Sequence, residues 1–279
     1  MPGINVALSG VAETSLITLY ARALESERPD ALIRDLKAAA IVSQLNFDFS
    51  RIRLYGHDEV AVILRLREFD RFVRDFLSRR PDAVVVHIGC GLDTRFDRVD
   101  NGRVDWFDLD LPEVIDLRRS LLGGERERYH LVSGSILDSA WLGAVSLHRR
   151  RHFLFLAEGV LPYFEEAQVR ALFLALLEHF PGAELVCDSF TPFIVWVDNL
   201  HLAFWKIKAR LRWKLKRPGD VESWGEGISL LEEWYYFDRP EPRLGAARLM
   251  RHFPLLGRCT GIFRYQLGRR SRDVVGVRS

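Results

Sequence analysis

The chain has 279 residues, of which 48% are hydrophobic and 28% charged, the balance of an ordinary globular protein. Its formal net charge of +2 argues against a global electrostatic attraction to nucleic acid. Its three cysteines are scattered, its first ten residues lack the basic and apolar pattern of a secretory leader, and no apolar run reaches the ~18 residues that span a bilayer. We therefore expect a cytoplasmic protein without disulfides, metal or membrane contact.

The first eighty residues show the helical spacing of apolar side chains. Leucines and alanines recur every three or four positions over 14–45, and Pro29 divides this run in two. A further apolar stripe over 59–79 predicts a long helix that ends before Pro81. We therefore expect residues 1–80 to form an N-terminal helical cap.

A different pattern begins at residue 81. Ala83 to Ile88 is an almost unbroken apolar run, which is typical of a strand buried on both faces. Further strands then alternate with helices, which predicts an α/β fold with a doubly wound, mostly parallel sheet built on residues 81–190. The later strands are expected at 104–109, 129–133, 153–157 and 184–188, and the helices between them at 112–122 and 165–180.

The last third of the chain is less regular. A long helix is expected over 193–216, rich in tryptophan, and seven basic residues lie between Lys206 and Arg217. Two final strands are expected at 233–238 and 259–267. Residues 191–232 would then form a helical lid over the substrate, and residues 233–279 would complete the sheet of a single domain.

A glycine motif follows the first strand of the sheet. Gly89-Cys90-Gly91 lies at the carboxyl end of that strand, where doubly wound sheets bind ligands, and glycine lets a ligand approach the backbone closely. A plain tight turn would also explain the motif. Thr94 stands where the dinucleotide fingerprint has its third glycine, which disfavours NAD and FAD.

Acidic residues end the second strand. Asp108 and Asp110 lie roughly twenty residues after the glycines, where a carboxylate accepts hydrogen bonds from a ribose diol. An extended strand points both side chains to the same side, so the pattern does not decide between them. It suits an adenosine ligand without a pyrophosphate, of which S-adenosylmethionine is the common one.

Glu158 follows the apolar run from Phe153 to Leu156. An isolated buried carboxylate is costly, so Glu158 is expected to have a positively charged partner. That partner is either a sulfonium or amino group of a cofactor, or a nearby arginine.

Three segments are specific enough to name a family. Gly89 to Arg95 (GCGLDTR), Trp106 to Ile115 (WFDLDLPEVI) and Leu156 to Phe164 (LAEGVLPYF), with Thr18 to Asp35 before them, resemble the leucine carboxyl methyltransferase family. Within it they are similar to a bacterial branch of tetracenomycin-type polyketide O-methyltransferases. The resemblance implies a class I methyltransferase-like sheet of seven strands and S-adenosylmethionine as the cofactor.

The resemblance also assigns residues to the cofactor. Asp110 would hold the ribose, Glu158 the methionyl amino group, and Arg65 the cofactor carboxylate, although Arg65 could instead decorate a solvated helix face. Gly89 would lie against the methionine portion. The further cofactor residues of the same glycine segment would be Cys90, Gly91 and Asp93.

The adenine position departs from the family pattern. The family usually places an aspartate and a leucine there, whereas this chain has Ser135 and Ile136, so the adenine contact is altered. Asp138 could compensate for the missing carboxylate. A helix N-cap explains Asp138, or Ser135, equally well.

The methyl acceptor implied by the resemblance is the carboxylate of a small polyketide-like or aromatic acid. A carboxylate is already ionised at neutral pH, so in-line transfer by positioning needs no general base. We therefore assign no catalytic residue. The candidate substrate contacts are Tyr20, Tyr163 and Trp196.

Other functions stay open. A phenol or another hydroxyl acceptor would require a base, and a protein C-terminal carboxylate is the acceptor in the leucine branch. From a different class, the basic stretch 206–217 could bind nucleic acid or an anionic membrane, although a lid helix or a solvated face explains it as well. The sequence gives no indication of the oligomeric state.

Overall fold

The apolar run after Pro81 forms β3, the central strand of a seven-stranded sheet. The computed structural model describes residues 4–6, 8, 10–52, 56–148, 151–204, 209–238 and 241–268, and within them the strand order is β5–β4–β3–β6–β7–β9–β8. In this sheet β9 runs antiparallel to β7 and β8, while the remaining neighbours are parallel. The predicted α/β fold with a doubly wound, mostly parallel sheet is confirmed. The strands are β3 (Val84–Ile88), β4 (Asp105–Asp110), β5 (Tyr129–Ser133), β6 (Phe153–Ala157), β7 (Ala183–Phe190), β8 (Ile228–Tyr235) and β9 (Thr260–Leu267).

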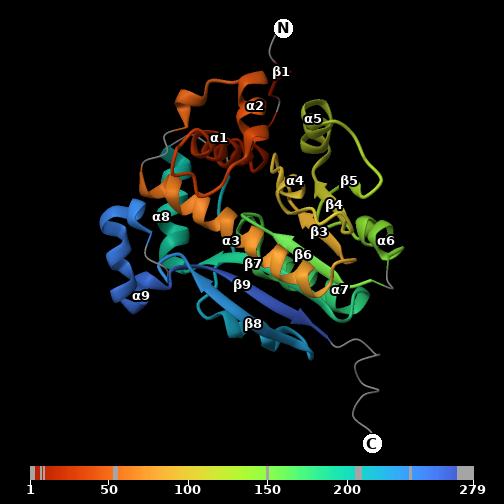
Figure 1. Cartoon of the computed structure of the whole chain (residues 1–279). Helices are drawn as coiled ribbons and strands as arrows, with labels where there is room; N and C mark the ends of the chain where they lie inside the picture. Colours follow the sequence, from red (N-terminus) through yellow and green to blue (C-terminus); the bar gives the residue numbers. More distant parts are fainter. Residues whose placement is uncertain are drawn as a thin grey trace, which may run out of the picture.

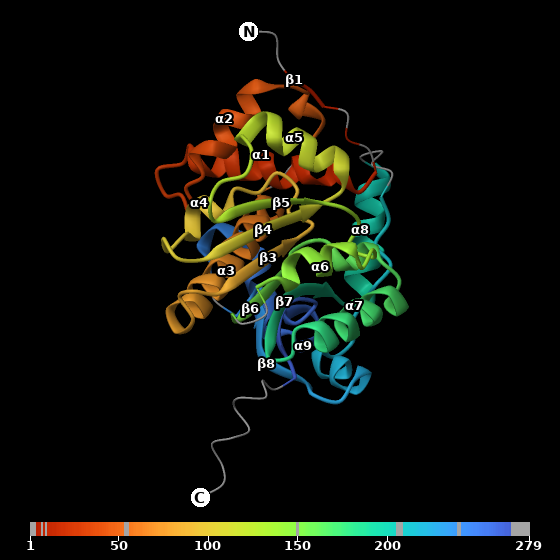
Figure 2. The same cartoon turned by 90° about the vertical axis from the view of Figure 1, so that its right-hand side faces the viewer.

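Helices cover both faces of this sheet (Figures 1 and 2). Val84, Val86 and Ile88 of β3 pack in the apolar cluster on the face covered by α6 and α7. Val85 packs in the opposite cluster, with α3. Burial on both faces explains why β3 is apolar at successive positions. The helices are α3 (His57–Arg79), α4 (Arg95–Val99), α5 (Pro112–Leu122), α6 (Ala140–Ser146) and α7 (Glu166–His179).

Two N-terminal helices, α1 (Ser15–Ser26) and α2 (Leu36–Gln44), lie beyond the carboxyl ends of the parallel strands (Figure 1). Leu16 of α1 and Ile41 of α2 pack in one apolar cluster with Leu92, which follows β3. This contact places the two helices over the turn that carries the glycine motif.

Short elements connect these layers. No described helix is long and apolar enough to cross a membrane. All three cysteines are free and buried. The short elements are β1 (Ile4–Asn5), β2 (Leu45–Asn46), α9 (Pro254–Gly257) and the 3-10 helices η1 (Ala12–Thr14), η2 (Phe49–Arg51), η3 (Leu161–Tyr163), η4 (Pro218–Trp224) and η5 (Pro242–His252).

The predicted helix over 193–216 is wrong in its second half. The observed helix α8 (Pro192–Phe204) ends early, and residues 209–216 form an extended stretch that we call the extended basic segment. Lys206 and Lys208 of the basic stretch lie outside the described residues. The strand expected at 233–238 begins earlier, since β8 starts at Ile228, inside the range expected for the lid.

Side chains alternate along the extended basic segment. Leu211, Trp213 and Leu215 are buried, and the residues between them are exposed. A period of two is the pattern of an extended chain, whereas a helix would bury every third or fourth residue. Backbone hydrogen bonds hold the segment, with the Arg212 N–H donating to the Pro162 carbonyl at 2.7 Å. The exposed residues are Arg210, Arg212, Lys214 and Lys216.

This alternation predicts opposite effects for adjacent substitutions. Trp213→Ala should lower the free energy of unfolding by about 3–5 kcal/mol, because it empties a site where the side chain is 1% exposed. Lys214→Ala, the matched control, should change it by less than about 0.5 kcal/mol. Urea unfolding followed by fluorescence measures both, and equal losses would contradict the extended arrangement.

Candidate functional site

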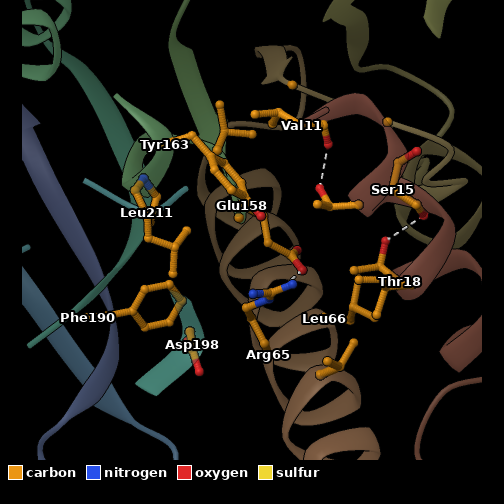
Figure 3. A pocket seen from close by; sticks show the side chains of 18 of the residues that line it. Val11, Ser15, Thr18, Arg65, Leu66, Glu158, Tyr163, Phe190, Asp198 and Leu211 are labelled. Atoms are coloured by element: carbon orange, nitrogen blue, oxygen red, sulfur yellow. Dashed lines mark hydrogen bonds and ion pairs between the residues drawn. The ribbon is translucent and has the colours of Figure 1, made fainter. Parts of the chain in front are cut away.

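A cavity of about 820 Å³ lies where the carboxyl ends of the parallel strands meet the N-terminal helices (Figure 3). Open α/β sheets bind ligands at this edge. Turns after β3, β4 and β5 line one half, which we call the glycine half. The end of β7, α8 and the segments after β8 line the other, which we call the apolar half. The glycine half includes Gly89, Gly91, Asp110, Gly134, Ser135 and Ile136, and the apolar half Phe190, Phe193, Ile194, Val197, Leu211 and Met250.

Two glycines of the motif have backbone conformations that other residues rarely adopt. The φ angles are +63° at Gly89 and +51° at Gly91. A Cβ atom on Gly89 would lie 2.2 Å from the Val160 side chain, and one on Gly91 would lie 2.9 Å from Ser15 Cβ. The turn after β3 is therefore packed between α1 and the turn after β6. Because glycine has no Cβ atom, this turn, α1 and the turn after β6 can pack closely at the cavity wall.

Asp108 of β4 is a structural residue. It is 2% exposed, and it accepts hydrogen bonds from Trp106 Nε1 at 2.7 Å and from the Tyr129 hydroxyl at 2.6 Å. It also pairs with the buried Arg118. Burial raises the pKa of Asp108, but Arg118, His87 and the Tyr129 hydrogen bond together outweigh it and hold that pKa below its usual value.

Asp110 instead lies on the cavity wall. Its Oδ2 accepts a hydrogen bond from the Gly91 N–H at 2.7 Å, and its Oδ1 accepts one from the Leu111 N–H at 2.7 Å. A carboxylate oxygen can accept two hydrogen bonds, so each oxygen keeps one position for a ligand. Burial raises the pKa of Asp110, and these two N–H groups oppose that rise. Two free acceptor positions fit the two hydroxyl groups of a ribose.

Arg65 and Glu158 meet near the middle of the cavity wall (Figure 3). Arg65 Nε donates to Glu158 Oε1 at 3.0 Å, and Arg65 Nη1 donates to Asp188 Oδ2 at 3.3 Å. Arg95 Nη2 gives Glu158 a second ion pair at 2.6 Å. The arginine expected as an alternative partner of Glu158 is therefore present. Arg65 lines the cavity and does not decorate a solvated helix face.

Ion pairs continue from Glu158 toward the N-terminal helices. Arg95 also pairs with Asp70 at 2.7 Å, Asp70 with Arg98 at 2.8 Å, and Arg98 with Asp35 at 3.1 Å. Their side chains are at most 9% exposed. The buried ion-pair chain, as we call it, is Arg22, Asp35, Arg98, Asp70, Arg95, Glu158, Arg65 and Asp188.

Asp93 lines the cavity beside this chain. It pairs with Arg98 at 2.9 Å and with Arg95 at 3.2 Å. Burial raises the pKa of Asp93, but Arg95 and Arg98 outweigh it and hold that pKa well below its usual value. Cys90 also lines the cavity, and burial raises the pKa of its thiol.

The adenine position is also on the cavity wall. Ser135 and Ile136 both line the glycine half. Ser135 Oγ accepts a hydrogen bond from the Leu137 N–H at 3.2 Å. Asp138 is not among the described lining residues, and it accepts a hydrogen bond from the Ala140 N–H at 3.0 Å at the start of α6. Asp138 therefore forms a turn with the backbone just before α6, whose N-cap residue is Ser139.

The three expected substrate contacts have different positions. Tyr163 lines the cavity, close to Leu211 (Figure 3). Tyr20 stacks on Phe49 at 5.0 Å between ring centroids, and Trp196 is 62% exposed on α8. Neither Tyr20 nor Trp196 is among the described residues that line the cavity. The structure brings one of the three to the site.

Three residues at the site were missed by sequence reasoning. Arg95 is the last residue of the GCGLDTR segment, but its sequence position does not predict its ion pairs with Glu158 and Asp70. Asp188 stands at the carboxyl end of a predicted strand, as Asp110 does. Because ligands bind at that edge of an α/β sheet, its position alone could have indicated a site residue. Tyr236 follows β8 and lines the cavity next to Arg65, and no local pattern distinguishes it from Tyr235.

Comparison with known proteins identifies the family. The model of the family described as "Leucine carboxyl methyltransferase" matches residues 15–176, which is more than half of the chain. The chain belongs to the leucine carboxyl methyltransferase family. The match covers the whole glycine half and Arg65, Glu158 and Tyr163, and it ends before α8.

Curated relatives extend the similarity further. The chain is 35% identical over 239 residues to the tetracenomycin polyketide synthesis O-methyltransferase TcmP of Streptomyces glaucescens, covering 85% of this chain and 87% of the relative. It is 36% identical over 253 residues to the S-adenosyl-L-methionine-dependent methyltransferase dpfgK of Gibberella zeae, covering 83% and 84%. The family member described here thus aligns over most of its length with both.

Solved structures share the fold. A DUF574 family protein from Streptomyces avermitilis superposes with a TM-score of 0.60 at 17% identity, over 91% of this chain and 96% of that one. A putative methyltransferase from Thermobifida fusca gives 0.55 at 17% identity, over 90% and 94%. At this identity the likeness concerns the fold alone.

The contrast between the two aspartates of β4 is testable. With the ribose held by Asp110 as expected, Asp110→Ala should raise the Kd for S-adenosylmethionine by about 10- to 100-fold, because the diol would lose two hydrogen bonds. Asp108→Asn should leave that Kd within about threefold and lower the melting temperature, since Arg118 loses its partner. Calorimetric titration and thermal unfolding measure both, and tight cofactor binding by Asp110→Ala would refute the ribose role.

The buried ion-pair chain predicts a pH-dependent loss of stability. Asp70→Asn should lower the free energy of unfolding by about 3–5 kcal/mol at pH 7, since Arg95 and Arg98 lose a buried partner. Burial raises the pKa of Asp70, but Arg98 and Arg95 outweigh it and hold that pKa below its usual value of 3.8.

The sign of the pH effect follows from this lowered pKa. The stability that Asp70 contributes is complete above its unfolded pKa and is lost as the pH falls through its folded pKa. Wild type and Asp70→Asn should therefore converge below pH 4 in urea unfolding. Asp75→Asn on the same helix is the control, because Asp75 is 48% exposed and should change stability little. A constant gap between pH 7 and pH 3 would contradict the pairing.

Proposed function

We propose that this protein transfers a methyl group from S-adenosylmethionine to the carboxylate of a small aromatic or polyketide-like acid. The general activity, S-adenosylmethionine-dependent methyl transfer, is supported by family membership and by the names of the two relatives, one an O-methyltransferase and the other an S-adenosyl-L-methionine-dependent methyltransferase. The observation that supports a carboxylate acceptor is the Tyr163 hydroxyl, a hydrogen-bond donor on the wall of the apolar half, where Tyr163 packs with Phe190 and Leu211. Arg65, beside Glu158, remains assigned to the carboxylate of the cofactor.

The residues of the glycine half fit the cofactor. Asp110 has acceptor positions for the ribose hydroxyls, and Glu158 offers a carboxylate to the methionyl amino group. Gly89 and Gly91 leave the wall without side chains where the methionine portion would lie. Ser135 and Ile136 would contact adenine through a hydroxyl and an apolar surface.

Bound S-adenosylmethionine supplies an electrophilic methyl group, which a carboxylate oxygen takes as the methyl–sulfur bond breaks and its electron pair stays on sulfur. An acceptor carboxylate is ionised at neutral pH, so the chain needs no base to activate it. Among the described lining residues the one histidine is His87, which is 2% exposed and lies between Asp108 and Arg95. The residues therefore act by binding, alignment and exclusion of water.

The apolar half suits a flat acceptor. Phe190, Leu211 and Val197 provide apolar walls, and the side chains of α8 and the extended basic segment enclose them. We propose that α8 and the extended basic segment form the lid over the acceptor, and that α1 and α2 form the cap, since residues 228–232 belong to β8 and α3 packs on the sheet. An aromatic or polyketide-like acid would bury its rings here and present its carboxylate toward Tyr163.

A hydroxyl acceptor is the second candidate, and one observation favours it. Asp198 of α8 lines the apolar half, where its carboxylate could take a proton from a phenol. Its negative charge adds to the burial that raises the pKa of Tyr163. A protein C-terminal carboxylate and a polyanion bound by Arg210 to Arg217 are further alternatives, and no contact in the cavity favours either.

Transfer of labelled methyl groups decides between acid and hydroxyl acceptors. The purified protein, labelled S-adenosylmethionine and a panel of aromatic acids with matched phenols should give products from the acids. Mild alkali should release the label as methanol, because methyl esters hydrolyse where aryl methyl ethers do not. Labelled, alkali-resistant product from phenols, with none from acids, would overturn the carboxylate proposal. Asp198→Asn would then be expected to abolish the phenol reaction.

A further inference from the structure

Apolar side chains surround the opening of the cavity. Val11, Phe193 and Met250 each line the cavity and are at least 37% exposed, so they stand where the cavity meets solvent. Phe193 belongs to α8 and Met250 to η5, while Val11 directly precedes η1. Three separate parts of the chain therefore place apolar groups around the opening.

The apolar surface continues outward from the opening. Phe193, Trp196 and Leu200 recur at helical spacing along α8, and all three are more than half exposed. The short helix α9 lies on the same side of the molecule as α8 (Figure 1). Single exposed apolar side chains are ordinary, but a group of them around a cavity marks a binding surface. We call this group the apolar rim: Val11, Phe193, Trp196, Leu200, Met250 and Phe253.

Positive charge is concentrated in the stretches that carry the apolar rim. Residues 192–217 contain seven basic residues and one acidic, and residues 241–258 contain four basic and one acidic. The whole chain has a net charge of +2, so its remaining residues are net negative. Carboxylates outside the two stretches pair with Arg212, Arg217 and Arg243. Exposed basic residues of the two stretches also include Arg210, Lys214, Lys216, Arg248 and Arg251.

Asn199 holds the extended basic segment against α8. Its side-chain amide donates a hydrogen bond to the Leu211 carbonyl at 2.9 Å, and its Oδ1 accepts one from the Leu211 N–H at 2.8 Å. Leu211 lines the cavity, whereas Arg210 and Arg212 on either side of it are exposed. The charges of the segment are therefore fixed at the surface next to α8.

These charges decide what covers the apolar rim. A second copy of the chain would bring the same positive charges to the same contact, and like charges oppose it. A lipid surface with anionic headgroups neutralises them instead, and each basic residue near such a surface strengthens binding. Exposed tryptophan and phenylalanine flanked by arginine and lysine are typical of helices that lie in a membrane interface.

We propose that the apolar rim and the exposed basic residues beside it bind the surface of an anionic lipid bilayer, with the opening of the cavity facing the lipid. Phe193 and Trp196 insert among the acyl chains, while Lys214 and Arg248 contact headgroup phosphates. An apolar acceptor dissolved in the bilayer then enters the apolar half without crossing water. The contact does not depend on which group of the acceptor is methylated. No continuous apolar run encodes this surface, so the sequence predicted no membrane contact.

Vesicle binding by the whole chain tests the charge requirement. Wild type is sedimented with vesicles of phosphatidylcholine, and with vesicles of phosphatidylcholine and phosphatidylglycerol in equal parts. Partition onto the anionic vesicles should be at least about tenfold stronger, because several basic residues lie near the headgroups. Added salt should weaken it. The proposal is overturned if wild type binds neither vesicle or binds both equally.

A matched pair of variants tests the apolar rim. Trp196→Ser should lower partition onto the anionic vesicles by about tenfold, because a large apolar side chain no longer leaves water. Leu147→Ser is the control, since Leu147 is 86% exposed at the end of α6, away from α8 (Figure 1). It should change partition by less than about twofold. Both variants should bind S-adenosylhomocysteine as wild type does, which shows that they are folded, and equal partition of the two would refute the role of the rim.

Brominated lipid reports whether the apolar rim inserts. In anionic vesicles with bromine on the acyl chains, wild-type tryptophan emission should be quenched on binding. Trp196→Phe should lose most of this quenching while it stays bound, because Trp196 is the inserted tryptophan. Undiminished quenching in this variant would contradict the proposed orientation.

Light scattering addresses the second copy as the rival occupant. Wild type that is monomeric and binds anionic vesicles supports the proposal. If wild type instead forms a dimer that Trp196→Ser separates, and does not bind the vesicles, a second copy covers the apolar rim and the proposal is refuted.

Discussion

The buried ion-pair chain is the interaction on which the rest of the structure depends. Charged groups away from water are stable only with partners, so each arginine of the chain fixes the position of two different parts of the fold. Asp35 at the start of α2, Arg98 in α4 and Glu158 after β6 are linked in this way. The N-terminal helices therefore cannot move far from the sheet without breaking buried pairs. The width of the cavity between them is set by these contacts, and so is the place of Arg65 on its wall.

Much of the fold could be predicted because its signals are local. The apolar run of β3 and the amphipathic pattern of α3 each depend on neighbouring residues, and Pro112 marks the start of α5 by itself. The site was predicted less completely. Motifs led to Gly89 and Asp110, but separating Asp110 from Asp108 requires knowing that Arg118 and Tyr129 surround the latter. Such partners lie in other elements of the fold, so the residue pattern of a single strand does not predict them.

The extended basic segment and Tyr236 show two different reasons for failure. In the first, tryptophans and basic residues suggested a helix, although the alternation of Leu211, Trp213 and Leu215 was present in the sequence and predicts an extended chain. In the second, no local signal existed. Tyr236 lines the cavity because the fold brings the end of β8 to the same wall as Arg65, whose position in the sequence is far away. Acceptor contacts are hard to predict for the same reason, since the apolar half is assembled from α8, η5 and the ends of β7 and β9.

The charges of the extended basic segment also affect how copies of the protein meet. An extended stretch near the surface resembles the edge of a sheet, and exposed edges can pair with the same segment of another molecule. Here Arg210, Arg212, Lys214 and Lys216 are all exposed, at alternate positions along one stretch. Arg212 is paired with Glu165 at 2.8 Å, but two such segments laid side by side would still set the positive charges of Arg210, Lys214 and Lys216 against the same three of the other copy. Neighbouring strands are closer than the Debye length of about 8 Å at physiological salt, so this repulsion is only partly screened. The segment that contributes Leu211 to the apolar half thereby also opposes strand-to-strand aggregation.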